Sequence, residues 1–153
     1  MKHIVTEERI VAPWLNAKLG DVYAEGVATY IGLVQNGQLI AGVKYDGFNH
    51  SNINMHVASE GKHWLNREFL WFTFYYPFEQ LQCRRITALV AETNLEAIRF
   101  DENLGFTLEA ALEDGHPDGN LLVYKMLKKD CRWLNLKRPH HAPQPEDLSL
   151  HPS

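Results

Sequence analysis

The amino-acid sequence predicts a mixed α/β fold, and three segments carry that prediction. Residues 29–45 contain two apolar runs separated by Asn36 and Gly37, the pair favoured in a β-hairpin turn whose central residues both need a positive φ. Residues 66–81 are apolar almost all round, which is typical of a buried helix. Residues 84–92 form an apolar run suited to the middle of a sheet. Because a strand also precedes the helix, we expect a crossover connection between two parallel neighbouring strands.

The strand that precedes this helix covers residues 52–58 and alternates in polarity. Because successive side chains of a strand point to opposite faces, Asn54 and His56 share one face. The other face carries Ile53, Met55 and Val57. We expect this strand to pair with the second strand of the hairpin and to present one polar and one apolar face.

Three further features complete the expected order of elements. Residues 13–21 can form a short helix near the N-terminus. Pro77 removes a backbone donor, so it should end or kink the helix at residues 66–81. Residues 107–112 and 120–127 indicate a closing hairpin around the turn-rich residues between them.

The composition is that of a globular protein with a single domain. The chain has 153 residues, of which 45% are hydrophobic and 22% charged, and this suffices to bury one core. A net charge of −4 gives no sign of nucleic-acid binding, although an acidic chain can still act on tRNA. Cys83 and Cys131 lack metal-ligand spacing, and the sequence has no signal-peptide-like or membrane-spanning apolar run. We therefore expect a cytoplasmic protein with no metal site and no membrane contact.

The last part of the chain, residues 135–153, differs in composition from the rest. It holds four of the seven prolines and few residues that form cores. We expect a domain at residues 1–134 followed by a disordered Pro/His-rich tail. His140 and His141 could bind a metal adventitiously, but a solvated tail is the simpler interpretation.

A second helix is expected shortly after residue 92. Asn94 can cap its start, and Gly105 can supply the left-handed residue that ends it. Three apolar residues fall on one face at helical spacing. They are Ala97, Phe100 and Leu104. Asp101 borders this apolar face, so a carboxylate is expected at the edge of a surface that should be buried.

This order of elements, together with the segment around the second helix, resembles the GNAT family of N-acetyltransferases. In that family a strand is followed by Asn, then Ala, an aromatic or aliphatic residue, and Gly-Phe. The matching residues here are Asn94, Ala97, Gly105 and Phe106. The likeness covers residues 25–128, is most specific at 84–106, and implies a central twisted mixed sheet with a splayed parallel strand pair, flanked by helices. A short match, DCRWL at 130–134, is similar to GNAT-like proteins of phages and prophages.

The resemblance implies acetyl-CoA as the acetyl donor and a place for it on strand 52–58 and the loop that follows. The pantetheine arm would pair with the backbone near Met55 and Val57, and the pyrophosphate would meet the N-terminus of the next helix. Asn94, at the end of the neighbouring strand, is a candidate both for helix cap and for cofactor contact. The candidates in the loop are Gly61, Lys62, His63, Trp64, Leu65 and Asn66.

The loop departs from the pattern of the family, which has Arg or Gln followed by glycines at alternate positions. Gly61 alone is kept, His63 and Leu65 stand where glycines are expected, and Glu60 replaces a basic or polar residue. Side chains at these places narrow the loop and limit positive φ. Lys62 or His63 could supply the contacts instead, and loss of nucleotide binding is the alternative.

Three residues are candidates for proton transfer. Asp101 stands where many GNAT enzymes have a Tyr that acts as general acid. An ionised Asp donates a proton poorly unless its pKa is raised, so Asp101 could instead orient a water, hold the substrate ammonium or be a solvated residue without a role. His56 suits the removal of a proton from an amine, with a structural His as the alternative. Tyr124 is a second candidate acid, although most strand tyrosines are packing residues.

The resemblance implies an N-acetyltransferase that moves an acetyl group from acetyl-CoA to a primary amine by direct transfer in a ternary complex. The acceptor can be a small molecule or a protein, and a homodimer is left open. The altered loop favours an alternative, a catalytically inactive GNAT-like binding or phage structural protein. The stretch from Asn94 to Phe106 favours the enzyme. An enzyme that uses another acyl-CoA is a third hypothesis.

Overall fold

The computed structural model describes residues 1–61 and 66–135 of the chain. The elements, in order, are β1 (Lys2–Val5), α1 (Glu8–Leu19), β2 (Thr29–Gln35), β3 (Gln38–Asp46), β4 (Asn52–Ser59), α2 (Arg67–Tyr75), η1 (Tyr76–Gln80), β5 (Arg85–Ala91), α3 (Leu95–Leu104), β6 (Thr107–His116), β7 (Gly119–Leu127), η2 (Lys128–Asp130) and η3 (Arg132–Asn135). The strands form one seven-stranded sheet in the order β1-β2-β3-β4-β5-β7-β6. Strands β4 and β5 are parallel, and the other neighbours are antiparallel. The predicted mixed α/β class is confirmed.

The predicted hairpin and the predicted helix break are both present. Asn36 and Gly37 have φ values of 52° and 81°, as the tight turn between β2 and β3 requires. Helix α2 ends at Tyr75 and continues as the π-helical turn η1, which contains Pro77. In that turn the Leu81 amide donates to the Tyr76 carbonyl at 3.0 Å. Proline therefore ends the regular helix, as predicted.

Two elements near the N-terminus differ from the prediction. The first helix begins at Glu8, not at residue 13, and Pro13 lies inside it. Pro13 and Arg9 are exposed, so the Arg9 carbonyl that loses its amide partner can bond to water. Strand β1 was not predicted, because its four residues are two polar ones followed by two apolar ones and show no alternation. The closing hairpin is confirmed, although β6 extends to His116.

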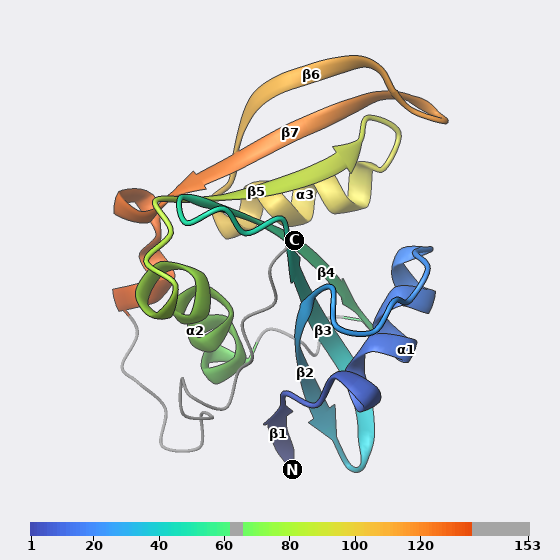
Figure 1. Cartoon of the computed structure of the whole chain (residues 1–153), viewed down its shortest axis with the longest axis vertical. Helices are drawn as coiled ribbons and strands as arrows, with labels where there is room; N and C mark the ends of the chain where they lie inside the picture. Colours follow the sequence, from blue (N-terminus) through green and yellow to red (C-terminus); the bar gives the residue numbers. More distant parts are fainter. Residues whose placement is uncertain (62–65, 136–153) are drawn as a thin grey trace.

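Helices α1 and α2 cover opposite faces of strands β2–β4 (Figure 1). Gly32 of β2 pairs with Gly42 of β3 under α1. A Cβ atom at Gly32 would lie 2.8 Å from the Leu39 side chain and 2.9 Å from that of Val11. The missing side chain therefore lets α1 pack close to the sheet, where Val11 is fully buried.

The main core lies on the other face and is rich in aromatic residues from α2 and η1. The aromatic residues that sequence assigned to the core are all buried or packed against it, namely Phe69, Trp71, Phe72, Tyr75, Tyr76 and Phe78. Trp133 of η3 stacks on Phe74, and its Nε1 donates to the Leu104 carbonyl at 2.8 Å. The last described turn thus closes the core and the end of α3. No helix within the two described ranges is long and apolar enough to cross a membrane.

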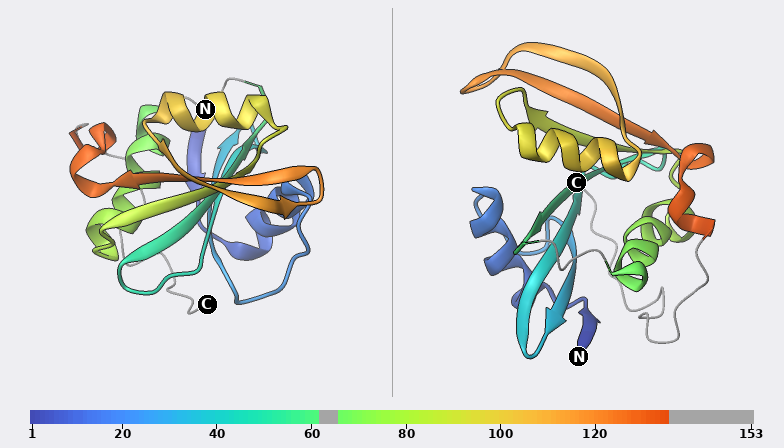
Figure 2. Two further views of the ribbon diagram at one scale, coloured as in Figure 1. Left: turned by 90° about the horizontal axis from the view of Figure 1, so that it is seen from above. Right: turned by 180° about the vertical axis from the view of Figure 1, so that it is seen from behind.

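Strands β4 and β5 are joined over a short length only. The parallel register pairs Asn52–Asn54 with Arg85–Thr87, while β4 continues to Ser59 and β5 to Ala91. Beyond this register the sheet divides into a β1–β4 part and a β5–β7–β6 part, and α3 lies beneath the second part (Figures 1 and 2). The expected splayed parallel pair is confirmed, and it opens the sheet where the polar residues of β4 lie.

Candidate active site

A cavity of about 530 Å³ lies where β4 and β5 separate. Its walls come from the second halves of β4 and β5, helix α3, the end of α1 with the residues after it, and the hairpin of β6 and β7 at His116 and Leu121. The lining includes His56, Val57, Asn94, Asp101, Lys18 and Asp21. The cleft therefore collects side chains from distant parts of the sequence at the opening of the sheet.

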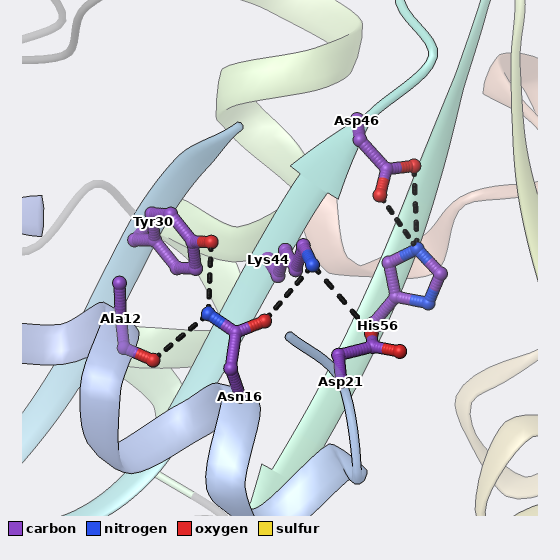
Figure 3. A network of polar contacts seen from close by, with 7 residues as sticks. All are labelled: Ala12, Asn16, Asp21, Tyr30, Lys44, Asp46 and His56. Atoms are coloured by element: carbon purple, nitrogen blue, oxygen red, sulfur yellow. Dashed lines mark hydrogen bonds and ion pairs between the residues drawn. The ribbon is translucent and has the colours of Figure 1, made fainter. Parts of the chain in front are cut away.

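His56 lies on the β4 wall and is held by a carboxylate of the neighbouring strand. Its Nε2 is 3.2 and 3.3 Å from the two carboxylate oxygens of Asp46 on β3 (Figure 3). Burial raises the pKa of Asp46, but hydrogen bonds from His56 and Asn54, with the charges of His56 and Lys44, outweigh burial and leave the pKa below its usual value. Asp46 is therefore ionised at neutral pH and is a fixed acceptor for the imidazole.

A buried lysine sits next to this pair. Lys44 is the cross-strand partner of His56 and is 8% exposed. Its Nζ donates to Asn16 Oδ1 at 2.9 Å and lies 3.5 Å from Asp21 Oδ2. Asn16 Nδ2 in turn donates to the Ala12 carbonyl and to the Tyr30 hydroxyl, so α1 and the sheet share one polar network (Figure 3).

Asp101 occupies the opposite wall, on α3. It is 8% exposed, so its interpretation as a solvated helix residue is wrong. Burial, then the charge of Glu102, raises the pKa of Asp101 to about 7, while the charge of His56 acts in the other direction. Within residues 1–61 and 66–135, no hydrogen bond or ion pair holds its carboxyl group. Asp101 can therefore carry a proton near neutral pH, which an ordinary Asp cannot.

The third predicted catalytic residue, Tyr124, does not line the cavity. It is buried on β7, and its hydroxyl donates to Glu102 Oε2 at 3.1 Å. Burial, followed by the bond to Glu102 and the nearby carboxylates, raises the pKa of Tyr124. The residue links β7 to α3 through Glu102, whereas His56 and Asp101 line the cavity.

The structure describes five of the nine residues predicted to bind the cofactor. Met55 and Val57 line the cavity from β4. Asn94 also lines it, and it caps α3, because its Oδ1 accepts from the Ala97 amide at 3.2 Å. Asn66 caps α2 by accepting from the Phe69 amide at 3.0 Å. Gly61 has a left-handed φ of 64°.

The other four predicted contacts, Lys62, His63, Trp64 and Leu65, lie outside the described residues. Glu60 is one of the residues at which the loop departs from the pattern of the family. Its carboxylate forms an ion pair with Lys18. Lys18 itself lines the cavity at the end of α1, and its Nζ lies 5.7 Å from the Trp14 ring centre. The negative charge that seemed unsuited to a phosphate site is thus balanced by a cation.

Sequence reasoning missed Asp46, Lys44 and Asn16. The signal for the first two was present, because Asp46 follows Lys44 by two residues on the strand opposite His56 and so shares its face. Asn16 could not have been placed, since its role depends on how α1 packs on the sheet.

Comparisons with known proteins give a consistent result for the fold. No protein-family model and no curated protein sequence matches this chain. Mutant forms of the spermidine/spermine N-acetyltransferase SpeG from Vibrio cholerae match it with a TM-score of 0.68 and 16% identity, over 88% of this chain and 98% of that one. A ribosomal-protein-S5-alanine acetyltransferase from Vibrio fischeri matches with a TM-score of 0.58 and 16% identity, over 82% of this chain and 72% of that one.

A third similar structure is a dodecameric spermidine N-acetyltransferase from Vibrio cholerae, with a TM-score of 0.66 and 15% identity, over 84% of this chain and 94% of that one. Nothing in these likenesses supports a phage or prophage branch. At such low identity the likeness establishes the fold. The chain has the GNAT fold, with a mixed sheet opened at one parallel strand pair, in common with these acetyltransferases.

Proposed function

We propose that this chain is an N-acetyltransferase that moves an acetyl group from acetyl-CoA to a primary amine in the cleft between β4 and β5. One observation carries the proposal. The opening of the parallel pair holds His56 and Asp101 on opposite walls, one imidazole held by a carboxylate and one carboxyl with a pKa of about 7. A base and a protonated acid on either side of one cavity suit the transfer of an acyl group between a thiol and an amine.

The described residues fit acetyl-CoA, which supplies an acetyl group activated as a thioester. The β4 backbone at Met55 and Val57 lies beyond the register with β5 and faces the cavity, so it is suited to pair with a peptide-like arm. Asn66 caps a helix whose first amides are suited to an anion. Lys18 offsets the charge of Glu60 at the start of the loop. These residues would hold the donor, together with Asn94, which lines the same cavity.

The acceptor in this proposal is a small-molecule or protein amine. The similar structures include a spermidine/spermine N-acetyltransferase and a ribosomal-protein-S5-alanine acetyltransferase, whose acceptors carry amino groups. Asp21 and Glu96 line the same cavity as Asp101, and carboxylates favour a cationic amine. The proposal includes self-association of the chain, since one of the similar proteins is dodecameric. Light scattering measures the oligomeric state of the chain.

The chain's own groups divide the work of the reaction. His56 accepts the proton that the amine loses as it attacks, directly or through a water. A backbone N–H of β4 near Val57 donates to the oxygen on which negative charge develops. Asp101, when protonated, can donate a proton to the leaving thiolate, and when ionised it can hold the ammonium of the acceptor. Transfer within one ternary complex then needs no covalent link to the chain.

A transfer assay tests the proposal. The full chain is mixed with acetyl-CoA and, in turn, spermidine, lysine and a peptide with N-terminal alanine, and free CoA thiol and the mass of the acceptor are followed. We expect at least one amine to gain a single acetyl group at a rate that depends on enzyme concentration. Equal rates with and without the chain for every amine, at saturating acetyl-CoA, would refute the proposal.

A further inference from the structure

We infer that Asp46 is a positioning residue that fixes the tautomer of His56, with the proton on Nε2 and the lone pair of Nδ1 presented to the cleft. The inference rests on the proposed function in one respect, namely that Nδ1 receives the proton of the amine. The choice of tautomer itself depends only on the contact between Asp46 and His56.

The choice of tautomer follows from the chemistry of the two groups. An ionised carboxylate accepts hydrogen bonds and has none to donate, so an imidazole nitrogen bonded to it must carry a proton. The nitrogen in contact with Asp46 is Nε2, at 3.2 and 3.3 Å from both oxygens. In the neutral ring the other nitrogen, Nδ1, is therefore the acceptor. Figure 3 shows Nδ1 on the side of the ring turned away from Asp46.

The sheet makes this arrangement rigid. Lys44 and Asp46 are two residues apart on β3, so they project from the same face. The register pairs Lys44 with His56 and Asp46 with Asn54, which places Asp46 diagonally from His56 on the adjacent strand. Lys44 also favours the ionised form of Asp46, because it is a buried cation on the same strand. A network of strand side chains, not a loop, thus sets the direction of the imidazole.

Other titratable groups lie beside His56 or line the same cavity. From β3 these are Asp46 and Lys44, from α3 Asp101 and Glu96, and from the end of α1 and the residues after it Lys18 and Asp21, while His116 lines the same cavity. Asp46 alone among them has a hydrogen bond to the ring in the described part of the chain. Replacing Asp46 therefore changes the proton-bearing nitrogen, whereas replacing the others changes only the surrounding field.

The test compares Asp46→Asn, Asp46→Ala and, as a matched control, Asp130→Asn, which alters an exposed Asp far along the chain. An Asn amide can donate to Nε2 and so stabilise the opposite tautomer, while Ala leaves the ring free to choose. Nitrogen-15 NMR of the His ring in the full chain reports the tautomer without any turnover. We expect a proton on Nε2 in the wild type and the control, and a proton on Nδ1 in Asp46→Asn.

Kinetics add a readout that a merely structural role would not move. We expect kcat to fall about 10- to 100-fold in Asp46→Asn and less in Asp46→Ala, with KM for acetyl-CoA unchanged.

A wild-type ring with its proton on Nδ1, or an Asp46→Asn variant with the tautomer and kcat of the wild type, would overturn the inference. A tautomer that changes in Asp46→Asn while the wild type transfers no acetyl group supports the positioning by Asp46. That result would refute the proposed function and leave the positioning in place.

Discussion

Two aspartates lie in and beside the same cleft, and their surroundings shift their pKa values in opposite directions. Asp46 on β3 has the partners His56, Asn54 and Lys44, and its pKa is lowered although burial acts against this. Asp101 on α3 has no such partner in the described part of the chain, and burial raises its pKa to about 7. Both are carboxylates near one imidazole, yet only one of them can hold a proton at neutral pH.

The difference shows how the surroundings of a carboxyl group decide whether it is ionised or protonated at neutral pH. Carboxylates with hydrogen bonds and a nearby cation stay ionised, and carboxylates in apolar surroundings take up a proton. Here the first kind orients a histidine and the second faces it across the cavity. The division of labour therefore comes from the sheet and helix around each residue, since the two side chains are chemically identical.

The largest expected effect comes from removing the residue between the two aspartates. His56→Gln should lower kcat about 100- to 10,000-fold, because it deletes the proton acceptor, and it should also raise the pKa of Asp46 by removing its main partner. Steady-state kinetics measure the first effect. His3→Gln, at an exposed residue of β1, makes the same chemical change away from the cleft and should keep wild-type kinetics. Equal kcat in the two variants would remove His56 from the reaction.

The next effect tests the raised pKa of Asp101 through stability. Between its usual pKa of 3.8 and about 7, the folded state holds a proton that the unfolded state has lost, so the free energy of unfolding should fall as pH rises through this window. The Asp101→Asn variant does not lose stability in this way. Above the window its free energy of unfolding should exceed that of the wild type by roughly 2–4 kcal/mol, and below the window it should show no such gain. Urea unfolding at acidic and alkaline pH measures the difference. A constant offset at all pH values would mean that Asp101 has an ordinary pKa.

A smaller effect is expected from Lys44, which acts on one aspartate and not the other. Lys44→Met should raise the pKa of Asp46 and leave Asp101 unchanged. It should also cost about 1–3 kcal/mol of stability, because the buried Asn16 oxygen loses its donor. Carbon-13 NMR titration of the carboxyl groups and thermal unfolding measure both. Lys129→Met, at an exposed lysine, is the control, and a matching loss of stability there would count against the buried network.

The smallest effect concerns the helix that carries Asp101. Asn94→Ala removes the cap of α3 and should cost about 1 kcal/mol of stability. If Asn94 also contacts the donor, acetyl-CoA should bind more weakly than this small loss explains. Thermal unfolding and calorimetry in parallel separate the two effects, and unchanged affinity would leave Asn94 as a cap alone.

Local signals predicted most of the fold, and tertiary packing decided what was missed. The Asn36-Gly37 turn, the Pro77 break and the Gly105 cap each depend on one or two residues, so they could be read from the sequence. The start of α1 could not, because Pro13 is tolerated only where its face of the helix is exposed.

The candidate site was predictable in its location but not in its electrostatics. His56 and Asp101 were placed from strand alternation and helix spacing, and both line the cavity. The pKa of Asp101 depends on how deeply α3 is buried, and the role of Lys44 on how α1 packs, so neither could be inferred from spacing. The division of the chain at residue 134 stays a prediction, since residues 136–153 lie outside the described part.

The most direct test of the account is calorimetric titration of acetyl-CoA into the full chain and into Ala91→Trp, which places a large side chain on the β5 wall of the cavity. We predict saturable binding in the micromolar range for the wild type and no binding for the variant, with similar melting temperatures for both. The absence of binding to the wild type at millimolar acetyl-CoA, or equal affinity for the two proteins, would contradict the assignment of this cleft.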